Sequence, residues 1–430
     1  MKRTTCYLIG LIVLLGSPVF LLSQEANPFG NSGSFYGGIG LTTIDEQTFY
    51  TINLRPDISI GKFGVGLNVN LLYNTTTGSF RTEEYKGPAG WFKIIDYIRY
   101  GHKRDKFYTQ VGAFHTARIG HGFIMNHYTN VASYDNRKIG LALDIDFGLA
   151  GFETITNNLG RMEIIGGRGY VRPLRPYLDI PIIKNLTFGA SYITDVDPDG
   201  SGNTDDGFYA YGVDVELPLI KAEGFDTYTY FDWAQLDKHG SGVGFGIEAS
   251  FRMFAGLAGL SAKLERRLLG KEFLPAYFDA FYEVQRYNPQ EDGSVDRKDQ
   301  LLPLIQEETK GIFGELVGHV FQTIRLVGNY QKLDQKPKTG ILHFSAETME
   351  KIPLLALQAT YDKQGVETFN DIFTLDDRSI AKLGVGYKIK PYLVLFVDYI
   401  YTFQFDAEKN YYKPQKRYSA RIAFVQSFSF

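Results

Sequence analysis

The amino-acid sequence predicts an all-β fold, a single antiparallel up-and-down β-barrel of about 18–20 strands. Three observations predict it. The chain of 430 residues is rich in glycine and aromatic residues, with 46 Gly, 29 Tyr and 33 Phe, and is polar on average, with a mean hydropathy of −0.16. Many segments alternate between apolar and polar residues. Short and long connections between these segments alternate along the chain.

The composition excludes several other classes of protein. A polytopic helical membrane protein needs repeated long apolar runs, which the polar mean hydropathy rules out. A single cysteine excludes a disulfide-stapled scaffold. The 44% content of hydrophobic residues is too high for a disordered chain. The formal net charge of −3 offers no basic surface for nucleic acid, so no nucleic-acid partner is expected.

The first residues predict export. A short basic start precedes an apolar run from Cys6 to Leu22, and a polar stretch begins at Gln24. This pattern is typical of a signal peptide, here residues 1–23 with cleavage near Ser23. The alternative is an N-terminal membrane anchor, for which the run is short. We expect the rest of the chain to divide into a short periplasmic N-terminal segment and the barrel, residues 24–34 and 35–430.

Period-two alternation defines the expected strands, because successive side chains of a strand point to opposite faces. In the segment 48–60, for example, apolar residues occupy one parity and polar residues the other. The expected strands are 35–43, 48–60, 63–73, 91–100, 106–114, 139–147, 152–156, 162–172, 185–193, 207–217, 225–235, 242–252, 257–266, 276–286, 316–330, 339–348, 354–361, 380–389, 392–403 and 418–430.

The connections differ in length on alternate sides of this arrangement. Those on one side are mostly short (61–62, 148–151, 253–256 and 390–391), and those on the other are mostly long (74–90, 115–138, 194–206, 362–379 and 404–417). A bacterial transmembrane barrel has short periplasmic turns and longer extracellular loops, whereas a soluble sandwich has no reason to sort its loops. Residues 287–315 break the rule, since they are long on the short-turn side. A short helix or an additional hairpin there would explain the exception.

The end of the chain carries a resemblance to a known family. Apolar residues alternate through the last segment, which includes Phe428 and ends on Phe430. This resembles the C-terminal strand of Gram-negative outer-membrane β-barrel proteins of the porin-like kind, without identifying a subfamily. The resemblance implies location in the outer membrane of a Gram-negative bacterium, contact with its lipid, and recognition by the barrel-assembly machinery through this strand. The alternative is a secreted soluble β-protein that ends in phenylalanine.

Charged residues on the polar parity indicate what the barrel encloses. If the apolar parity faces lipid, the lumen receives charges of both signs: Arg55, Asp57, Asp144, Asp146, Asp214, Glu216, Asp226, Asp232, Glu248, Arg252, Lys263, Glu265, Asp279, Glu283 and Arg421. A hydrated lumen accommodates them, and a barrel of this size leaves an aqueous channel. The sequence therefore predicts a porin-like channel for passive diffusion of small polar solutes. The alternative is a lumen plugged by its own loops, as in a non-conducting structural or secretion-associated barrel.

The long segment 115–138 is the expected constriction, because it is rich in charge and would narrow the pore if it folded inward. The candidate pore residues are His115, Arg118, His121, Asp135 and Arg137 from this segment, with Asp144, Asp146, Glu248 and Arg252 from the wall. The three histidines of the segment are spaced six residues apart. In an extended chain at ~3.3 Å per residue they lie too far apart to share one metal ion.

Residues 195–206 resemble the calcium-binding loop that begins D-x-D-x-D-G. The candidate ligands are Asp195, Asp197, Asp199, Ser201, Asn203 and Asp206, so Ca²⁺ is the one cofactor considered. The last position holds Asp where the motif has a bidentate Glu, and the flanking segments read as strands rather than helices. The alternative is a solvated acidic loop.

No catalytic residues are predicted, and an enzyme is not expected. A barrel lipid hydrolase would need a serine beside a histidine with an orienting acid, and the sequence contains neither this arrangement nor a G-x-S-x-G motif.

Overall fold

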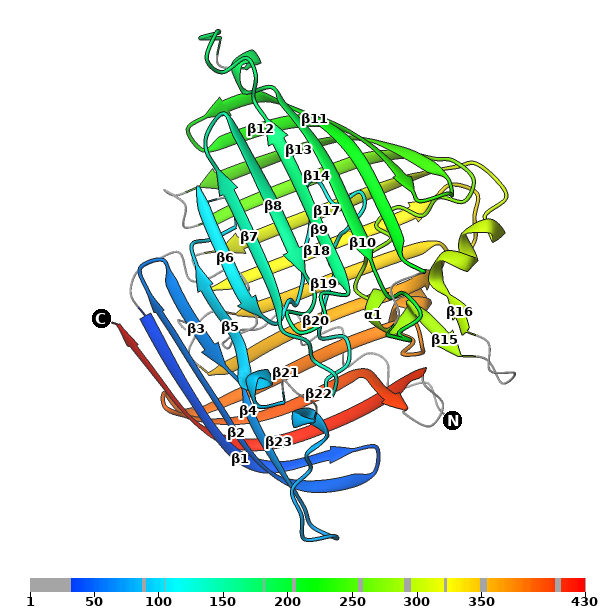
Figure 1. Cartoon of the computed structure of the whole chain (residues 1–430). Coiled ribbons are helices and arrows are strands. Elements are labelled where there is room, and N and C mark those ends of the chain that lie inside the picture. Colours follow the sequence, from blue (N-terminus) through cyan, green and yellow to red (C-terminus); the bar gives the residue numbers. More distant parts are fainter. Residues whose placement is uncertain are drawn as a thin grey trace, which may run out of the picture.

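The computed structural model describes residues 32–86, 90–103, 105–180, 182–202, 206–253, 258–289, 295–320, 323–348, 354–406 and 411–429. Within this part of the chain, 20 antiparallel strands close into one barrel (Figure 1). Strands β3 and β4 count as one strand interrupted at Asn68, because both pair with β2. Pairing of β1 with β23 closes the ring.

The strands follow one another around the barrel in chain order. Their bounds are β1 Ser32–Ile44, β2 Gln47–Ile60, β3 Phe63–Leu67, β4 Val69–Asn74, β5 Ile95–Tyr100, β6 Phe107–Gly112, β7 Gly140–Asp146, β8 Ala150–Thr156, β9 Ile164–Val171, β10 Thr187–Asp195, β11 Phe208–Ala222, β12 Phe225–Leu236, β13 Ser241–Met253, β14 Ala258–Leu269, β17 Thr309–Val320, β18 Ile324–Leu333, β19 Gly340–Thr348, β20 Leu355–Val366, β21 Ser379–Lys390, β22 Leu393–Asp406 and β23 Tyr411–Ser429.

Short elements lie in the connections. A small hairpin of β15 Tyr287–Pro289 and β16 Val295–Arg297 follows the single α-helical turn of the described residues, α1 Tyr282–Gln285. Short 3-10 helices span Glu83–Tyr85, Trp91–Ile94, Ile183–Asn185, Lys298–Leu304 and Phe369–Phe373. Among the described residues, no helix is long and apolar enough to cross a membrane.

The expected strand number agrees with the structure only because two errors in the expected strands cancel. Residues 276–286 were expected to form a strand, but they lie inside the barrel and include α1. Their apolar side chains pack in the lumen, which the sequence pattern does not distinguish from a strand. Residues 316–330 were expected to form one strand, but they belong to β17 and β18, which turn back on each other. Residues 321–323 are Phe, Gln and Thr, so none of the usual turn residues marks the reversal.

This correction also removes the exception among the connections. The long connection is 270–308, between β14 and β17, and it lies at the same end of the barrel as 113–139 between β6 and β7. The connection between β17 and β18 at the other end is short. Residues 287–315 contain both a hairpin, β15 with β16, and a 3-10 helix.

The wall of the barrel is apolar on its outer face and charged on its inner face, which is the reverse of the arrangement in a water-soluble protein. On β13, Phe245 is 49% exposed and Ile247 is 46% exposed, whereas Glu248 on the inward parity is 7% exposed. The same pattern continues on the neighbouring strand β14, where Leu264 is exposed and Lys263 and Glu265 are buried. Apolar side chains therefore cover the outside of the barrel, and charged side chains line the inside.

The first and last strands of the described residues, β1 and β23, form the closing pair. Strand β1 begins at Ser32, slightly before the expected start of the barrel, and the signal peptide lies outside the described residues. Position 428 belongs to β23 and pairs with Gly33, whereas Phe430 lies outside the described residues. The expectation that the last strand is recognised by the assembly machinery therefore stays a prediction.

Candidate functional site in the barrel lumen

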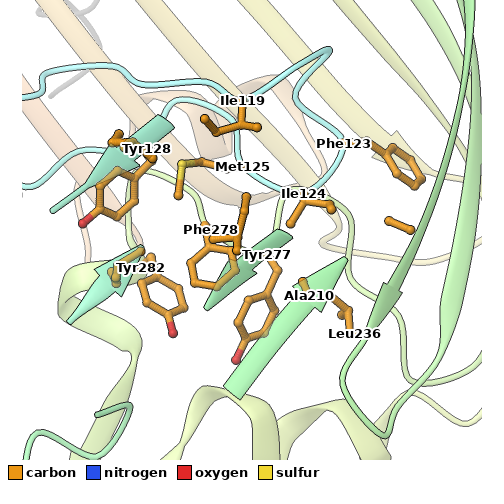
Figure 2. Packing of buried hydrophobic residues seen from close by; sticks show 14 of the residues in the cluster. Ile119, Phe123, Ile124, Met125, Tyr128, Ala210, Leu236, Tyr277, Phe278 and Tyr282 are labelled. Carbon is orange, nitrogen blue, oxygen red and sulfur yellow. The ribbon is translucent and has the colours of Figure 1, made fainter. Parts of the chain in front are cut away.

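Parts of two connections lie in the lumen: insert 1, residues 113–139, and insert 2, the described residues of 270–308. The backbone N–H of Asn126 donates to the carbonyl of Phe278 at 3.1 Å, and that of Ala276 donates to the carbonyl of Phe123 at 2.8 Å. Buried apolar side chains of both inserts pack together against inward-facing residues of the wall (Figure 2). This cluster includes Ile119, Phe123, Ile124, Met125, Tyr128, Tyr277, Phe278 and Tyr282 with Ala210 and Leu236 of the wall. The inserts therefore form one packed body inside the barrel.

Arg118 joins insert 1 to the wall midway along β17. Its guanidinium donates to both carboxylate oxygens of Glu315, at 2.9 Å for the Nη1 bond, and its Nε donates to Asn126 at 2.7 Å. The Arg118 side chain keeps 26% exposure, whereas Glu315 keeps 7%. One side of this ion pair therefore faces water inside the lumen.

A histidine pair lies next to this contact. The rings of His127 and His343 stack with centroids 4.1 Å apart, and His343 Nδ1 lies 2.7 Å from an Asp362 oxygen. Asn329 donates its amide to His127 Nε2 at 2.6 Å. Burial and the adjacent His343 lower the pKa of His127 to about 4. His127 is therefore neutral at physiological pH.

His121 forms a second attachment of insert 1, and this histidine is charged. Its Nδ1 lies 3.0 Å from Asp232 and its Nε2 lies 3.2 Å from Glu216, and the ring stacks on Tyr230 at 4.1 Å. Burial opposes the charge, but the Asp232 and Glu216 carboxylates raise the pKa of His121 to about 9. Lys263 donates to its backbone carbonyl. An imidazolium held between two carboxylates thus ties the insert to β11 and β12.

A third network joins the two inserts to each other and to the wall. Lys138 donates to Glu283 at 2.7 Å and also to Glu163, and Arg286 lies 3.5 Å from both Glu163 and Asp195. These carboxylates and Arg286 are almost fully buried. Although burial acts in the opposite direction, Lys138 and Arg286 lower the pKa of Glu163 to about 2. Lys138 and Arg286 therefore hold Glu163 as a carboxylate within a buried network.

Asp135 attaches the end of insert 1 to the connection between β4 and β5 and to β23. Arg81 donates to both of its oxygens, at 2.8 and 2.7 Å, and Arg417 donates to it at 2.6 Å. Burial disfavours the carboxylate, but the two guanidinium groups lower the pKa of Asp135 to about 2. Arg417 also donates to Glu84 at 2.7 Å.

The remaining predicted pore residues do not gather at one constriction. His115 lies 3.4 Å from Asp96, Asp144 lies 2.8 Å from Lys103, and Asp146 lies 2.9 Å from Arg172. Glu248 accepts hydrogen bonds from Tyr228 and Ser261, and Arg252 lies 2.5 Å from Asp226. The last residues of β7 and β13 place Asp146 and Arg252 near the short-turn end, away from insert 1. A pore role for these residues stays a prediction.

Sequence reasoning missed the partners that hold the inserts. His343 occupies the polar parity of its expected strand, so its inward direction is evident from the sequence. Glu315 lies just before the expected strand 316–330. Glu163 and Arg286 belong to the expected strands 162–172 and 276–286, but in the structure both fall in connections. Nothing in the local sequence shows which charged residues face each other across the lumen.

Among the described residues, two groups of side chains have the composition of a metal site. Ligand atoms of His121, Asp214 and Asp232 lie within 4.8 Å of one another, as do those of Asp197, Asp199 and Asp206. In the first group, Arg168 donates to both oxygens of Asp214 at 2.8 and 2.6 Å. The guanidinium and the His121 imidazolium already supply positive charge there.

The calcium-like loop is only partly assembled as a ligand set. Asp195 accepts hydrogen bonds from the backbone N–H of Asp197 at 3.1 Å and from Tyr282 at 2.9 Å. Arg161 pairs with Asp197, and Arg297 pairs with Asp206 at 2.6 Å. Ser201 donates its backbone N–H to Asp199 at 2.8 Å, and Asn203 lies outside the described residues. Calcium binding stays a prediction.

No protein-family model matches the chain, and no curated protein matches its sequence. The similar solved structures are outer-membrane barrels. CdiB from Acinetobacter baumannii matches with a TM-score of 0.27 and 8% identity over 92% of this chain and 60% of CdiB. Wzi, a carbohydrate-binding barrel involved in group 1 capsule assembly in Escherichia coli, matches with a TM-score of 0.35 and 13% identity over 94% of this chain and 85% of Wzi.

A third match is OprD, an outer-membrane protein from Pseudomonas aeruginosa, with a TM-score of 0.31 and 9% identity over 95% of this chain and 98% of OprD. At these scores the three likenesses carry no argument about activity. The chain also spans less than two thirds of the length of CdiB. The barrel itself rests on the strand pairing, which is antiparallel all around the ring.

Proposed function

We propose that this chain spans the outer membrane of a Gram-negative bacterium, with the short turns in the periplasm and both inserts entering from the outside. The apolar outer face of the wall supports this, because lipid is the environment that favours exposed Phe, Ile and Leu side chains. A closed ring of antiparallel strands is also the β-structure that pairs backbone groups with one another in hydrocarbon. The export pattern of the first residues is consistent with the same location.

Within this barrel we propose a narrow channel for small polar solutes rather than a wide diffusion pore. The observation that carries the proposal is the attachment of insert 1 at mid-barrel by Arg118 and His121, beside side chains that still reach water. Arg118 keeps 26% exposure and Glu216 keeps 32%. The inserts therefore occupy part of the lumen and leave charged side chains hydrated next to them.

Planar-bilayer recording of the refolded full-length protein tests the channel. We expect discrete conductance steps that are smaller than those of an unobstructed barrel of the same strand number. Permeation of neutral sugars of increasing size into proteoliposomes gives the size limit, and we expect exclusion of all but the smallest. Absence of steps at every voltage, with correctly folded barrel on the same gel, would reject the channel.

A non-conducting structural or secretion-associated barrel is the second candidate. The buried ion network of Lys138, Glu163, Glu283, Arg286 and Asp195 favours it, because this network joins both inserts to the wall and fills part of the lumen. The same recordings separate the two functions. A barrel that folds but carries no current supports the structural role.

A further inference from the structure

Among the described residues, several cationic side chains of the lumen have no carboxylate partner, and three of them lie in one region. Arg55 is on the inward parity of β2, Lys382 is on the inward parity of β21, and Arg137 belongs to insert 1. Across the described residues, none of the three forms a hydrogen bond or ion pair with a carboxylate. They differ in this from Arg118, Arg286 and the other charged groups that hold the inserts.

The three cations lie near two carboxylates, Asp96 at the start of β5 and Asp362 of β20. Asp96 interacts electrostatically with Arg137 and Arg55, and Lys382 interacts with Asp362, Asp96 and Arg137. His115 already contacts Asp96 at 3.4 Å, and His343 contacts Asp362 at 2.7 Å. The three cations therefore outnumber these two carboxylates, each of which already has a histidine partner.

Burial makes this surplus of charge informative. Arg137 is 8% exposed, and its Nε and Nη2 have no hydrogen-bond partner within the described chain. The Nε of Arg55 is likewise buried and unpaired. A buried guanidinium without a partner is unfavourable, so such donors usually face a ligand, an ion or water. The Asp96 and His115 side chains each keep 20% exposure, so solutes in the lumen can reach the cluster.

We propose that Arg55, Arg137 and Lys382 form a binding site for the carboxylate or phosphate group of a small solute. A guanidinium matches the two oxygens of such a group with parallel N–H donors, and a lysine adds a point charge. The inference rests on the proposed channel and gives its substrate class, which is small organic or inorganic anions. The paired charges elsewhere in the lumen hold the inserts, and these unpaired ones select the solute.

Calorimetry on the refolded full-length protein in detergent tests the site without requiring conduction. The probes are inorganic phosphate and succinate, and binding of either one supports the site and assigns the chemical source of the anion. We expect Arg137→Gln and Arg55→Gln each to weaken binding about tenfold, the ratio expected when one charge-assisted contact is lost. Arg137→Lys keeps the charge and should restore part of the affinity.

Arg172→Gln is the matched control, because Arg172 is already paired with Asp146 at 2.9 Å. It should leave phosphate and succinate affinity unchanged. Heat-dependent mobility on a gel confirms that each variant has folded. No binding of either anion to the wild type, or equal affinity in Arg137→Gln and wild type, would overturn the site.

Reversal potentials in a KCl gradient separate failure of the site from failure of the channel. We expect a preference for chloride over potassium that decreases in Arg137→Gln and not in Arg172→Gln. Anion binding without any current would reject the channel and keep the site. Current with an unchanged ion preference, together with absence of binding, would reject the site and keep the channel.

Discussion

Insert 1 meets the barrel wall in two different ways on its two sides. Toward β11–β17, each charge has a partner: Arg118 lies on Glu315, and His121 lies between Asp232 and Glu216. Toward β2 and β21, Arg137, Arg55 and Lys382 have no carboxylate partner among the described residues. Paired charges fix the position of a segment, whereas unpaired ones raise the local affinity for a counter-charge. The contrast separates side chains that hold the insert from side chains that are free to act on a solute.

The largest expected effect is on single-channel conductance, and it comes from removal of most of insert 1. Deleting residues 118–136 takes out most of insert 1's part of the apolar cluster and the Arg118, His121 and Asp135 attachments, but leaves Arg137. We expect single-channel conductance to rise several-fold, because the lumen of a barrel of this size is wide when nothing fills it. Bilayer recording measures the change. Deletion of 369–373, a short helix in another connection at the same end, serves as the control and should change little. An unchanged conductance after the larger deletion would show that insert 1 does not constrict the lumen.

A smaller effect is expected from breaking one buried pairing. Arg286→Met leaves Glu163, Glu283 and Asp195 without their shared cation, and loss of one partner from a buried pair costs about 3–5 kcal/mol. We expect insert 2 to detach, which trypsin cleavage of the folded barrel and increased leak conductance would report.

Arg266→Met is the matched control for this substitution. Arg266 pairs with Asp334 on the surface, where both side chains are more than 40% exposed, so its loss costs about 0–1 kcal/mol. If both variants are equally resistant to trypsin and equally tight, the buried network does not hold insert 2.

The sequence predicts the wall better than the contents of the lumen. Two environments, lipid and water, impose a period of two on strands such as β13, so Phe245 and Glu248 can be assigned to opposite faces without a structure. Inserts have no such constraint. Tyr277 and Phe278 resemble a strand because they are apolar, yet they pack against Met125 and Tyr128 of insert 1. The pairing of Arg118 with Glu315 joins positions far apart in sequence, and parity carries no information about it.

Two histidines of the same insert should respond to pH in opposite directions. The pKa of His127 is lowered to about 4, so as pH falls this histidine is protonated in the unfolded chain before it is protonated in the folded protein. Stability should therefore decrease as pH falls from about 6.5, the usual histidine value, toward 4. The pKa of His121 is raised to about 9, so its contribution is complete below about 6.5 and is lost as pH rises toward 9.

Single substitutions separate the two effects. His127→Gln should remove part of the loss at acid pH, and His121→Gln should remove part of the loss at alkaline pH. Urea midpoints of the refolded protein, followed by tryptophan fluorescence across this pH range, measure both. Parallel pH profiles for the two variants and the wild type would contradict the assigned charge states of the attachments.

The smallest effect should come from the calcium-like loop, which lies outside this comparison. Arg161 and Arg297 pair with Asp197 and Asp206, and Asp195 is engaged by Tyr282, so Ca²⁺ must compete with existing contacts. We therefore expect only weak binding, with a Kd on the order of 10⁻³ M, as in the weaker extracellular calcium modules. Calorimetry with Ca²⁺ on the intact protein should give a small heat that disappears in the double variant Asp197→Ala, Asp199→Ala. Flat titrations for both proteins would identify 195–206 as an acidic loop whose charges are balanced by arginine alone. Conductance should be the same with and without Ca²⁺, because the loop does not contact Arg118, His121 or Arg137 through any ion pair in the described part of the chain.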